Sequence, residues 1–342
     1  MKNQDPPREN LQPIVSLFNN GKLKQALSES NQMLEKFPNS VFLFNISGAS
    51  NAGLMQYDAA INSYKKALKI MPNYAEAYFN MGIALKNKGD LEAAIDSYKM
   101  ALKIKPDYVD VFYNMGNTLK EKGDLEASIT SFKMTLKIKP DHTDAYYNMG
   151  IAQNEKGDLE AAIASFKMTL KIKPDHADAY YNMGNALKDK GYLEAAIDCY
   201  KMTLKIMPDS SDAYFKIGIA LNKKGDFEAA LDSYKMALKI KPDHTDAYYN
   251  MGIALKRKGD FEAALDSYQK ALKIKPFYAP ALSQTHYLAT IMSDWALAKA
   301  LEKNLSSDQL EGNLSVYGLL SLEDNPTMHL KRATKLVKSK YN

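Results

Sequence analysis

The chain has 342 residues, with 45 Lys and Arg against 40 Asp and Glu and a formal net charge of +5. Five basic residues and no acid lie between Leu330 and Asn342, so the remainder balances at 40 against 40. Mixed signs throughout the chain disfavour a nucleic-acid-binding protein, which gathers basic residues on one face. The one cysteine, Cys199, excludes an intrachain disulfide and a multi-cysteine metal site.

Hydropathy gives no indication of a membrane protein or of an exported one. The first ten residues, MKNQDPPREN, contain no apolar segment, and no stretch approaches 18 consecutive apolar residues. We therefore expect a cytoplasmic protein without membrane contact.

Residues 1–40 contain a degenerate copy of a repeat that becomes clear further along. Gly21, Ala26 and Pro38 occupy its turn, small-residue and terminator positions. Terminal repeats are often atypical because one of their sides faces water. We predict an N-terminal capping repeat here.

From residue 41 to residue 278 a 34-residue pattern recurs seven times. The segment KPDHTDAYYNMGIA occurs verbatim from Lys139 and again from Lys241, which indicates recent duplication. A fixed period of this length is typical of a solenoid. The copies begin at Val41, Ala75, Val109, Thr143, Ala177, Ser211 and Thr245.

Each copy predicts two helices joined by a tight turn. In the copy from Thr143, the first helix places Tyr146, Met149, Gly150 and Gln153 at i, i+3, i+4 and i+7, which favours burial of one face. Gly157 can take the left-handed conformation after that helix, and Asp158 can cap the next one. The second helix should bury Leu159, Ala162, Ile163, Phe166, Thr169 and Leu170 before Pro174 stops it.

These positions resemble the tetratricopeptide repeat (TPR) family. The resemblance is carried in the copy from Ala75 by Tyr78, Met81, Gly82, Leu85, Ala94, Tyr98, Ala101 and Pro106. It implies an all-α fold, a right-handed superhelix of helix–turn–helix repeats whose first helices line the concave side. The family's usual role implies a protein or extended-peptide partner, and a homo-oligomer formed through the solenoid is also compatible.

A polar stripe lies beside the buried face of the first helices. Residues two, five, six, nine and twelve of each copy share it, because they are three or four apart. An aromatic residue followed by Asn recurs there, and Asn has poor helix propensity. The predicted peptide-binding residues are Phe79, Asn80, Tyr113, Asn114, Tyr147, Asn148, Tyr181, Asn182, Lys216, Tyr249 and Asn250, with Lys216 as the break in the pattern.

Two explanations of this stripe stay open. Duplication alone could have copied the asparagines, or they form a ladder of carboxamides that donate to and accept from the backbone of an extended polypeptide. Helices about 8–10 Å apart would place one carboxamide at every third residue or so of a strand that rises about 3.3 Å per residue. The aromatic residues could equally pack against the adjacent repeat.

Other candidate groups favour structural roles. Acids open six of the seven first helices, where they suit the helix dipole, and a preference for basic ligands is the lesser alternative. They are Glu76, Asp110, Asp144, Asp178, Asp212 and Asp246. His142, His176 and His244 lie in the loops of different copies, too far apart to share a metal ion, so we expect loop packing. No phosphate loop, HExxH or GxSxG motif occurs, and we expect neither catalysis nor a cofactor.

Residues 279–342 leave the 34-residue period. One or two helices are expected over 281–305, followed by an apolar run over 314–322 and a basic helix over 327–340, together a helical C-terminal cap. The segment also resembles the one that precedes the catalytic region in bacterial SPINDLY-like and O-GlcNAc-transferase-like glycosyltransferases. The residues that carry this resemblance are Asp294-Trp295, Ser315 to Leu322, Asp324-Asn325-Pro326, His329-Leu330 and Ala333.

Two functions follow. The first is a non-catalytic protein-interaction module that holds an extended polypeptide on its Asn stripe. The alternative is the substrate-recognition arm of a protein glycosyltransferase of that family, whose two-lobed catalytic domain lies outside this sequence.

Overall fold

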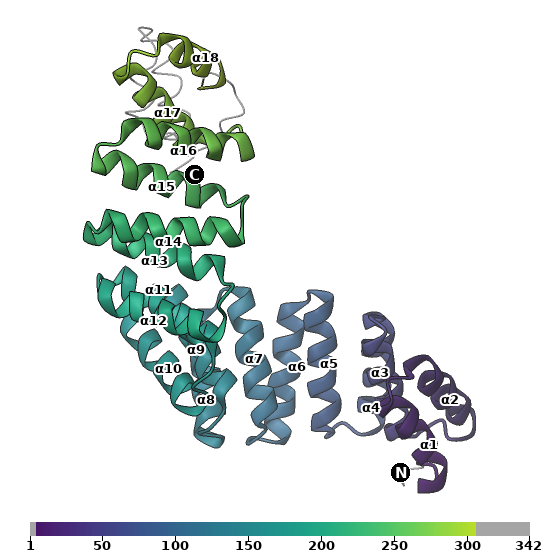
Figure 1. Ribbon diagram of the computed structural model, residues 1–342. Helices are drawn as coiled ribbons and strands as arrows, with labels where there is room; N and C mark the ends of the chain where they lie inside the picture. The colour runs from purple at the N-terminus through teal and green to yellow at the C-terminus, as the bar shows by residue number, and fades with distance from the viewer. Residues whose placement is uncertain (1–4, 306–342) are drawn as a thin grey trace, which may run out of the picture. The chain divides into compact units, whose positions relative to one another are not determined.

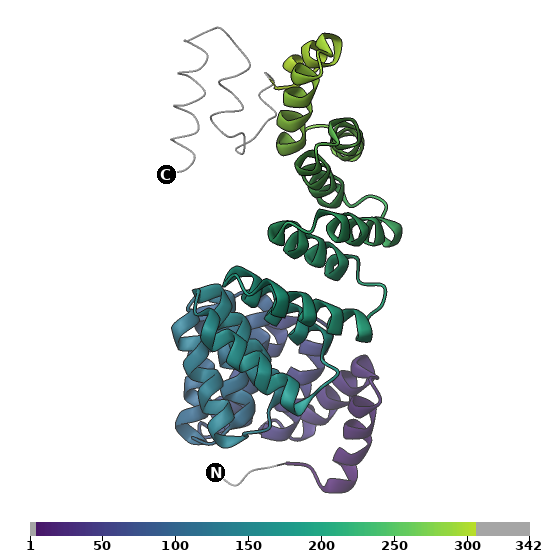
Figure 2. The same cartoon turned by 60° about the vertical axis from the view of Figure 1, so that its left-hand side comes forward.

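The computed structural model describes residues 5–305, and over this range the chain forms 18 helices and no strand. The chain divides into two compact units, one ending at Pro174 and the other beginning at Asp175. Each unit is a stack of antiparallel helical hairpins (Figures 1 and 2). The predicted all-α solenoid is confirmed.

The first unit holds five hairpins, drawn in purple to teal in Figure 1. Its first helix, α1, runs through Pro13, and the first helices of the following hairpins begin at the predicted starts of the copies. The bounds are α1 Arg8–Asn19, α2 Leu23–Lys36, α3 Val41–Gly53, α4 Tyr57–Ile70, α5 Ala75–Lys88, α6 Leu91–Ile104, α7 Val109–Lys122, α8 Leu125–Ile138, α9 Thr143–Lys156 and α10 Leu159–Ile172.

The second unit continues the same pattern through three full hairpins and then a shorter one with a different sequence. Its last pair, α17 and α18, matches the expectation of helices over 281–305. The bounds are α11 Ala177–Asp189, α12 Leu193–Ile206, α13 Ser211–Lys224, α14 Phe227–Ile240, α15 Thr245–Lys258, α16 Phe261–Ile274, α17 Ala279–Ile291 and α18 Trp295–Leu305. The predicted apolar run over 314–322 and basic helix over 327–340 lie outside the described residues.

The hairpin turns that lead into α6, α8, α10, α14 and α16 combine a glycine with a capping aspartate. Gly157 ends α9 with φ +89°, a conformation that a side chain disfavours. The Asp158 carboxylate then accepts a hydrogen bond from the backbone N–H of Ala161 at 3.2 Å, which satisfies a free donor at the start of α10. The predicted roles of both residues are confirmed.

The core of the seven hairpins from α3–α4 to α15–α16 contains a glycine packed under an aromatic ring. Phe166 on α10 is fully buried, and a Cβ added to Gly150 on α9 would lie only 2.7 Å from its Cε1 atom. The two helices therefore approach more closely than a larger residue would allow. Tyr or Phe fills the same buried slot in the other copies, at Tyr64, Tyr98, Phe132, Tyr200, Tyr234 and Tyr268.

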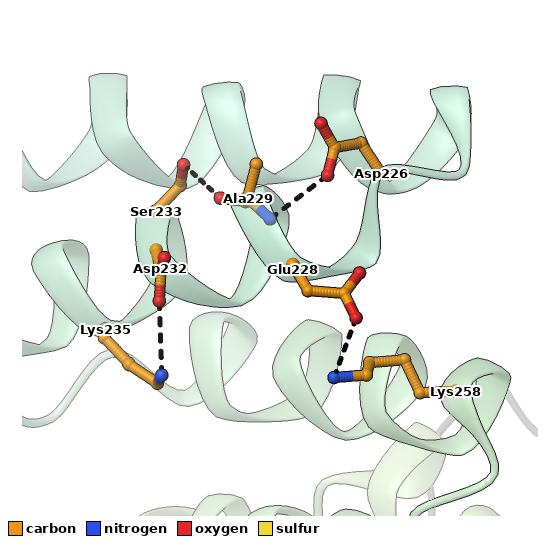
Figure 3. A network of polar contacts seen from close by, with 7 residues as sticks. All are labelled: Asp226, Glu228, Ala229, Asp232, Ser233, Lys235 and Lys258. Atoms are coloured by element: carbon orange, nitrogen blue, oxygen red, sulfur yellow. Dashed lines mark hydrogen bonds and ion pairs between the residues drawn. The ribbon is translucent and has the colours of Figure 1, made fainter.

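Exposed ion pairs link neighbouring hairpins within each unit. Glu228 at the start of α14 binds Lys258 at the end of α15, 3.0 Å away, as Figure 3 shows. The equivalent pairs are Asp58–Lys88, Glu92–Lys122, Glu126–Lys156 and Glu194–Lys224. The mixed charges of the copies thus include regular contacts between repeats.

Candidate peptide-binding site

The aromatic residues of the predicted site pack inside their own hairpins. The Tyr113 ring lies 6.1 Å from the ring of Phe132, and Tyr249 lies 5.7 Å from Tyr268. Phe79, Tyr147 and Tyr181 contact the equivalent buried rings of their own second helices. All five predicted aromatic residues are half-buried, so they support the helices that carry the stripe.

The same aromatic residues also contact the loop that enters the next repeat. Phe79 lies 5.2 Å from Tyr108, and Tyr113 lies 4.8 Å from His142, between ring centroids. In the second unit, Tyr249 meets Tyr278 edge-on at 5.6 Å. Packing against the adjacent repeat, one of the two roles expected for these residues, thus occurs at Phe79, Tyr113 and Tyr249.

In the first unit, the three predicted asparagines are half-buried at the same position of successive first helices. Asn80 on α5 donates to the Asn45 carboxamide oxygen at 3.3 Å, and Asn148 on α9 donates to the Tyr113 hydroxyl at 3.0 Å. Asn114 on α7 donates instead to the Asp110 carbonyl of its own helix at 2.8 Å. Two of the three side chains thus tie adjacent repeats together.

In the second unit, Asn182 on α11, Lys216 on α13 and Asn250 on α15 occupy this position and are half-buried. Asn250 donates to the Asp246 carbonyl of its own helix at 2.8 Å. Burial lowers the pKa of Lys216, and the positive charge of Lys188 lowers it further. The carboxylates of Asp212, Asp189 and Asp246 oppose this shift.

The carboxamides keep acceptor capacity. Asn114, Asn148 and Asn250 each donate a hydrogen bond through the amide nitrogen. Within residues 5–305, their side-chain oxygens accept none. Each amide group also carries a second hydrogen. A peptide N–H could therefore bind these oxygens without breaking an existing contact.

Two further carboxamides belong to the stripe and were missed from the sequence. Asn45 is the fifth residue of its irregular copy, where the regular copies have an aromatic residue, yet it reaches Asn80. Gln284 lies on α17, the sixth residue after the loop, and accepts from Lys256 at 2.6 Å. The Lys256 ammonium also lies 5.3 Å above the exposed ring of Tyr287. Counting residues from the start of α17 would have found Gln284.

The three loop histidines act as helix caps. The His142 Nδ1 atom accepts from the backbone N–H of Ala145 at 3.3 Å, and His176 and His244 cap α11 and α15 in the same way. Ser210 does so for α13 through its hydroxyl. No group of three or more metal-binding side chains occurs within residues 5–305.

The repeats place the chain in a known family. Models of the TPR repeat match residues 56–89, 85–123, 116–157, 154–191, 184–225 and 218–259, and a tetratricopeptide repeat model matches residues 245–278. Together they cover residues 56–278, well over half of the 342 residues. The chain belongs to the tetratricopeptide repeat family, and it is a protein-interaction module.

One curated relative is the probable UDP-N-acetylglucosamine–peptide N-acetylglucosaminyltransferase SEC of Arabidopsis thaliana. It is 39% identical over 74 residues, which are 22% of this chain and 8% of the relative. The chain thus matches only a small part of that protein's length.

Similar solved structures include MamA, at 30% identity over 48% of this chain and 97% of that chain, with a TM-score of 0.47. Another is YrrB, described as a TPR protein with an unusual peptide-binding site, at 23% identity over 55% of this chain and 97% of that chain, with a TM-score of 0.48. The family assignment rests on the repeat models. Within residues 5–305, no helix has the length and apolar character needed to cross a bilayer.

Proposed function

We propose that the chain is a non-catalytic module that binds an extended polypeptide along its Asn stripe. The observation that carries this proposal is the repeated, half-buried carboxamide with an unused acceptor oxygen on α7, α9 and α15. Such groups recognise the peptide backbone, which every polypeptide presents, so binding would tolerate many sequences.

The contacts of the aromatic residues narrow the proposal. Each of the five aromatic residues already packs against a neighbouring ring, as seen at Phe79, Tyr113, Tyr147, Tyr181 and Tyr249. They would therefore lie beside the bound peptide and contribute little to its affinity. Affinity would then come mainly from the carboxamides, each contributing a neutral hydrogen bond of about 1 kcal/mol.

A second candidate function is the substrate-recognition arm of a protein glycosyltransferase. The observation that favours it is the 39% identity over 74 residues to the plant transferase. The same stripe would then hold the polypeptide that receives the sugar. Sequence analysis also found a glycosyltransferase-like segment near the C-terminal end. Of the residues that carry this resemblance, only Asp294 and Trp295 lie among the described residues. The Trp295 side chain is 66% exposed.

An array of unstructured 15-residue peptides tests the first proposal. The triple variant Asn114→Ala, Asn148→Ala, Asn182→Ala should weaken binding across the array. Because Asn148→Ala also removes a bond between adjacent repeats, binding is compared at a temperature at which both proteins are fully folded. The matched control is Asn62→Ala with Asn87→Ala, two exposed asparagines on α4 and α5 that lie off the stripe. Equal binding by the wild type and the triple variant would overturn the proposal.

Two measurements refine the result. Tyr113→Phe removes the partner of Asn148 but keeps the carboxamide, so it should preserve peptide binding. Calorimetry with UDP-N-acetylglucosamine tests the non-catalytic part of the proposal, because measurable binding of this donor by the chain alone would contradict it.

A further inference from the structure

The second helices of the repeats carry lysines on their exposed sides. In two copies the first of these lysines pairs with an aspartate three residues before it, as Lys235 does with Asp232 at 3.2 Å on α14 (Figure 3). Lys99 and Asp96 form the same pair on α6, also at 3.2 Å. The aspartate therefore offsets part of the positive charge of these helices.

Two successive second helices of the first unit, α8 and α10, lack this aspartate. Exposed Thr130 and Ala164 occupy its position. The last turns of both helices have the same sequence, KMTLKIK, at residues 133–139 and 167–173, which we call the lysine surface. Within residues 5–305, its six lysines are exposed and form no ion pair. They are Lys133, Lys137, Lys139, Lys167, Lys171 and Lys173.

The lysine surface itself contains no carboxylate. The acids nearest in the chain are Glu126 and Glu160, in the first turns of α8 and α10, and Asp141 and Asp175, in the loops that follow. Glu126 already forms an ion pair with Lys156 on α9. The six lysines therefore outnumber the carboxylates beside them, and the surface has an excess of positive charge.

Apolar side chains lie beside these lysines. Ile138 and Ile172 are the last residues of α8 and α10, and each is 36% exposed. Met134 and Met168 lie one turn earlier on the same side of each helix and are half-buried. The helix dipole favours a basic residue at the end of a helix, but it gives no reason for exposed isoleucines between the lysines. Basic helices with apolar side chains of this kind are typical of binding at a membrane interface.

The charges are spread over an area. Both α8 and α10 pack against the same first helix, α9, in the first unit (Figure 1). Their lysines occupy equivalent positions of successive copies, so the charges repeat from one helix to the next and do not converge on one point. A lysine is a flexible point charge, which suits a ligand that presents many mobile anions.

We propose that the lysine surface binds a lipid bilayer that contains anionic head groups. The lysines would neutralise the head groups, and Ile138 and Ile172 would enter the interface, where apolar side chains are removed from water. The phosphates of a nucleic acid would satisfy the lysines but offer the isoleucines no apolar contact. Binding of this kind needs no helix that spans the bilayer.

This inference goes beyond the proposed function. The Asn stripe lies on the first helices, whereas the lysine surface lies on second helices. Loss of peptide binding in the asparagine variants would therefore leave bilayer binding unchanged, and each proposal can fail without the other.

The test is sedimentation of the full chain with vesicles at low and at high salt. The wild type should bind vesicles of phosphatidylcholine and phosphatidylserine in equal parts and should not bind pure phosphatidylcholine. High salt should weaken this binding, because it screens the exposed lysines. A wild-type chain that does not sediment with the anionic vesicles would overturn the proposal.

The decisive variant is Thr130→Asp with Ala164→Asp, which installs the aspartate of other copies and should fold normally. It should weaken binding to the anionic vesicles about 25-fold, at about fivefold for each lysine that gains a partner. The control is Gln25→Glu with Gln32→Glu, which adds the same two charges at exposed positions of α2 and should change binding little. Equal losses in both variants would show that only net charge matters, and the proposed surface would be wrong.

Ile138→Ser with Ile172→Ser tests contact with the bilayer itself. This variant should weaken binding at both salt concentrations, because burial of apolar side chains is not screened. Unchanged binding would contradict the proposal. Polyglutamate is the comparison ligand, since a chain that binds it but not the vesicles would have an acidic protein as its partner, and the proposal would fail.

Discussion

The Asn148 side chain on α9 donates a hydrogen bond to the hydroxyl of Tyr113 on α7, 3.0 Å away. One residue of the predicted ligand-binding stripe is thus also a link between adjacent repeats. The Asn148 side chain thus has a structural role and a proposed binding role. Changing Tyr113 alone removes the structural bond and leaves the carboxamide available for binding.

Tyr113→Phe should lower the free energy of unfolding of the first unit by about 0.5–1.5 kcal/mol, because it deletes this bond between neutral groups. Asn148→Ala should cost a similar amount, and the double variant little more than either, since both remove one contact. Urea unfolding of the four proteins measures this coupling. Fully additive losses would show that the bond does not stabilise the folded chain.

Gly150→Ala should destabilise the chain by about 1–3 kcal/mol, because the new methyl group would press on the Phe166 ring. Adding Phe166→Leu should recover part of the loss by trimming that ring. The contrasting variant is Gly157→Ala, which should be destabilising because Gly157 has a positive φ that alanine disfavours. An added methyl group would contact nothing there, so Phe166→Leu should not restore stability. Thermal unfolding of the two single and two double variants distinguishes these mechanisms.

Tyr268→Phe should be neutral or stabilising, because the buried Tyr268 hydroxyl has no hydrogen-bond partner within residues 5–305. Phe132 and Phe166 already fill the equivalent slot. Tyr200→Phe is the comparison, since the Tyr200 hydroxyl and the Asn185 carboxamide oxygen form a bond of 2.9 Å, and its loss should cost about 1 kcal/mol. Equal losses in both variants would contradict this account.

Stability should fall as the pH drops below about 6.5, with His244 contributing to the loss. Burial lowers the pKa of His244, outweighing the nearby charges of Asp212 and Asp246. The unfolded chain therefore takes up a proton at a higher pH than the folded chain, and acid favours unfolding. Protonation would also remove the Nδ1 acceptor that caps α15.

His244→Ser checks this prediction, because Ser210 caps α13 through the same contact. The variant should keep its stability at pH 7.5 and lose less than the wild type between pH 6.5 and 5. Identical pH profiles would exclude His244 as a source of the acid sensitivity.

Sequence alone predicted the hairpins almost to the residue, since turn glycines, capping aspartates and the helical period all agree at positions such as Gly157 and Asp158. It identified the stripe but not its contacts. The partner of Asn80 is Asn45, shifted by one residue in an irregular copy, and that of Asn148 is the tyrosine Tyr113. Such contacts depend on how the helices of neighbouring repeats pack together, and the sequence of one repeat does not determine that packing.

The histidines show the same limit. His142 and His244 were expected only to pack in loops, but their side chains cap helices, a role that Ser210 fills in another copy. The interchange of His and Ser at one position was visible in the sequence, and both side chains can accept a hydrogen bond.

The ion pair between Glu228 and Lys258 has four equivalents between other neighbouring hairpins, so successive junctions between copies are alike. A gene rearrangement that removed a whole number of copies would rejoin compatible surfaces, and the shortened protein should fold. The identical stretches beginning at Lys139 and Lys241 are natural crossover points for such a change. Variation in length by complete units is therefore the kind of evolution that this architecture tolerates best.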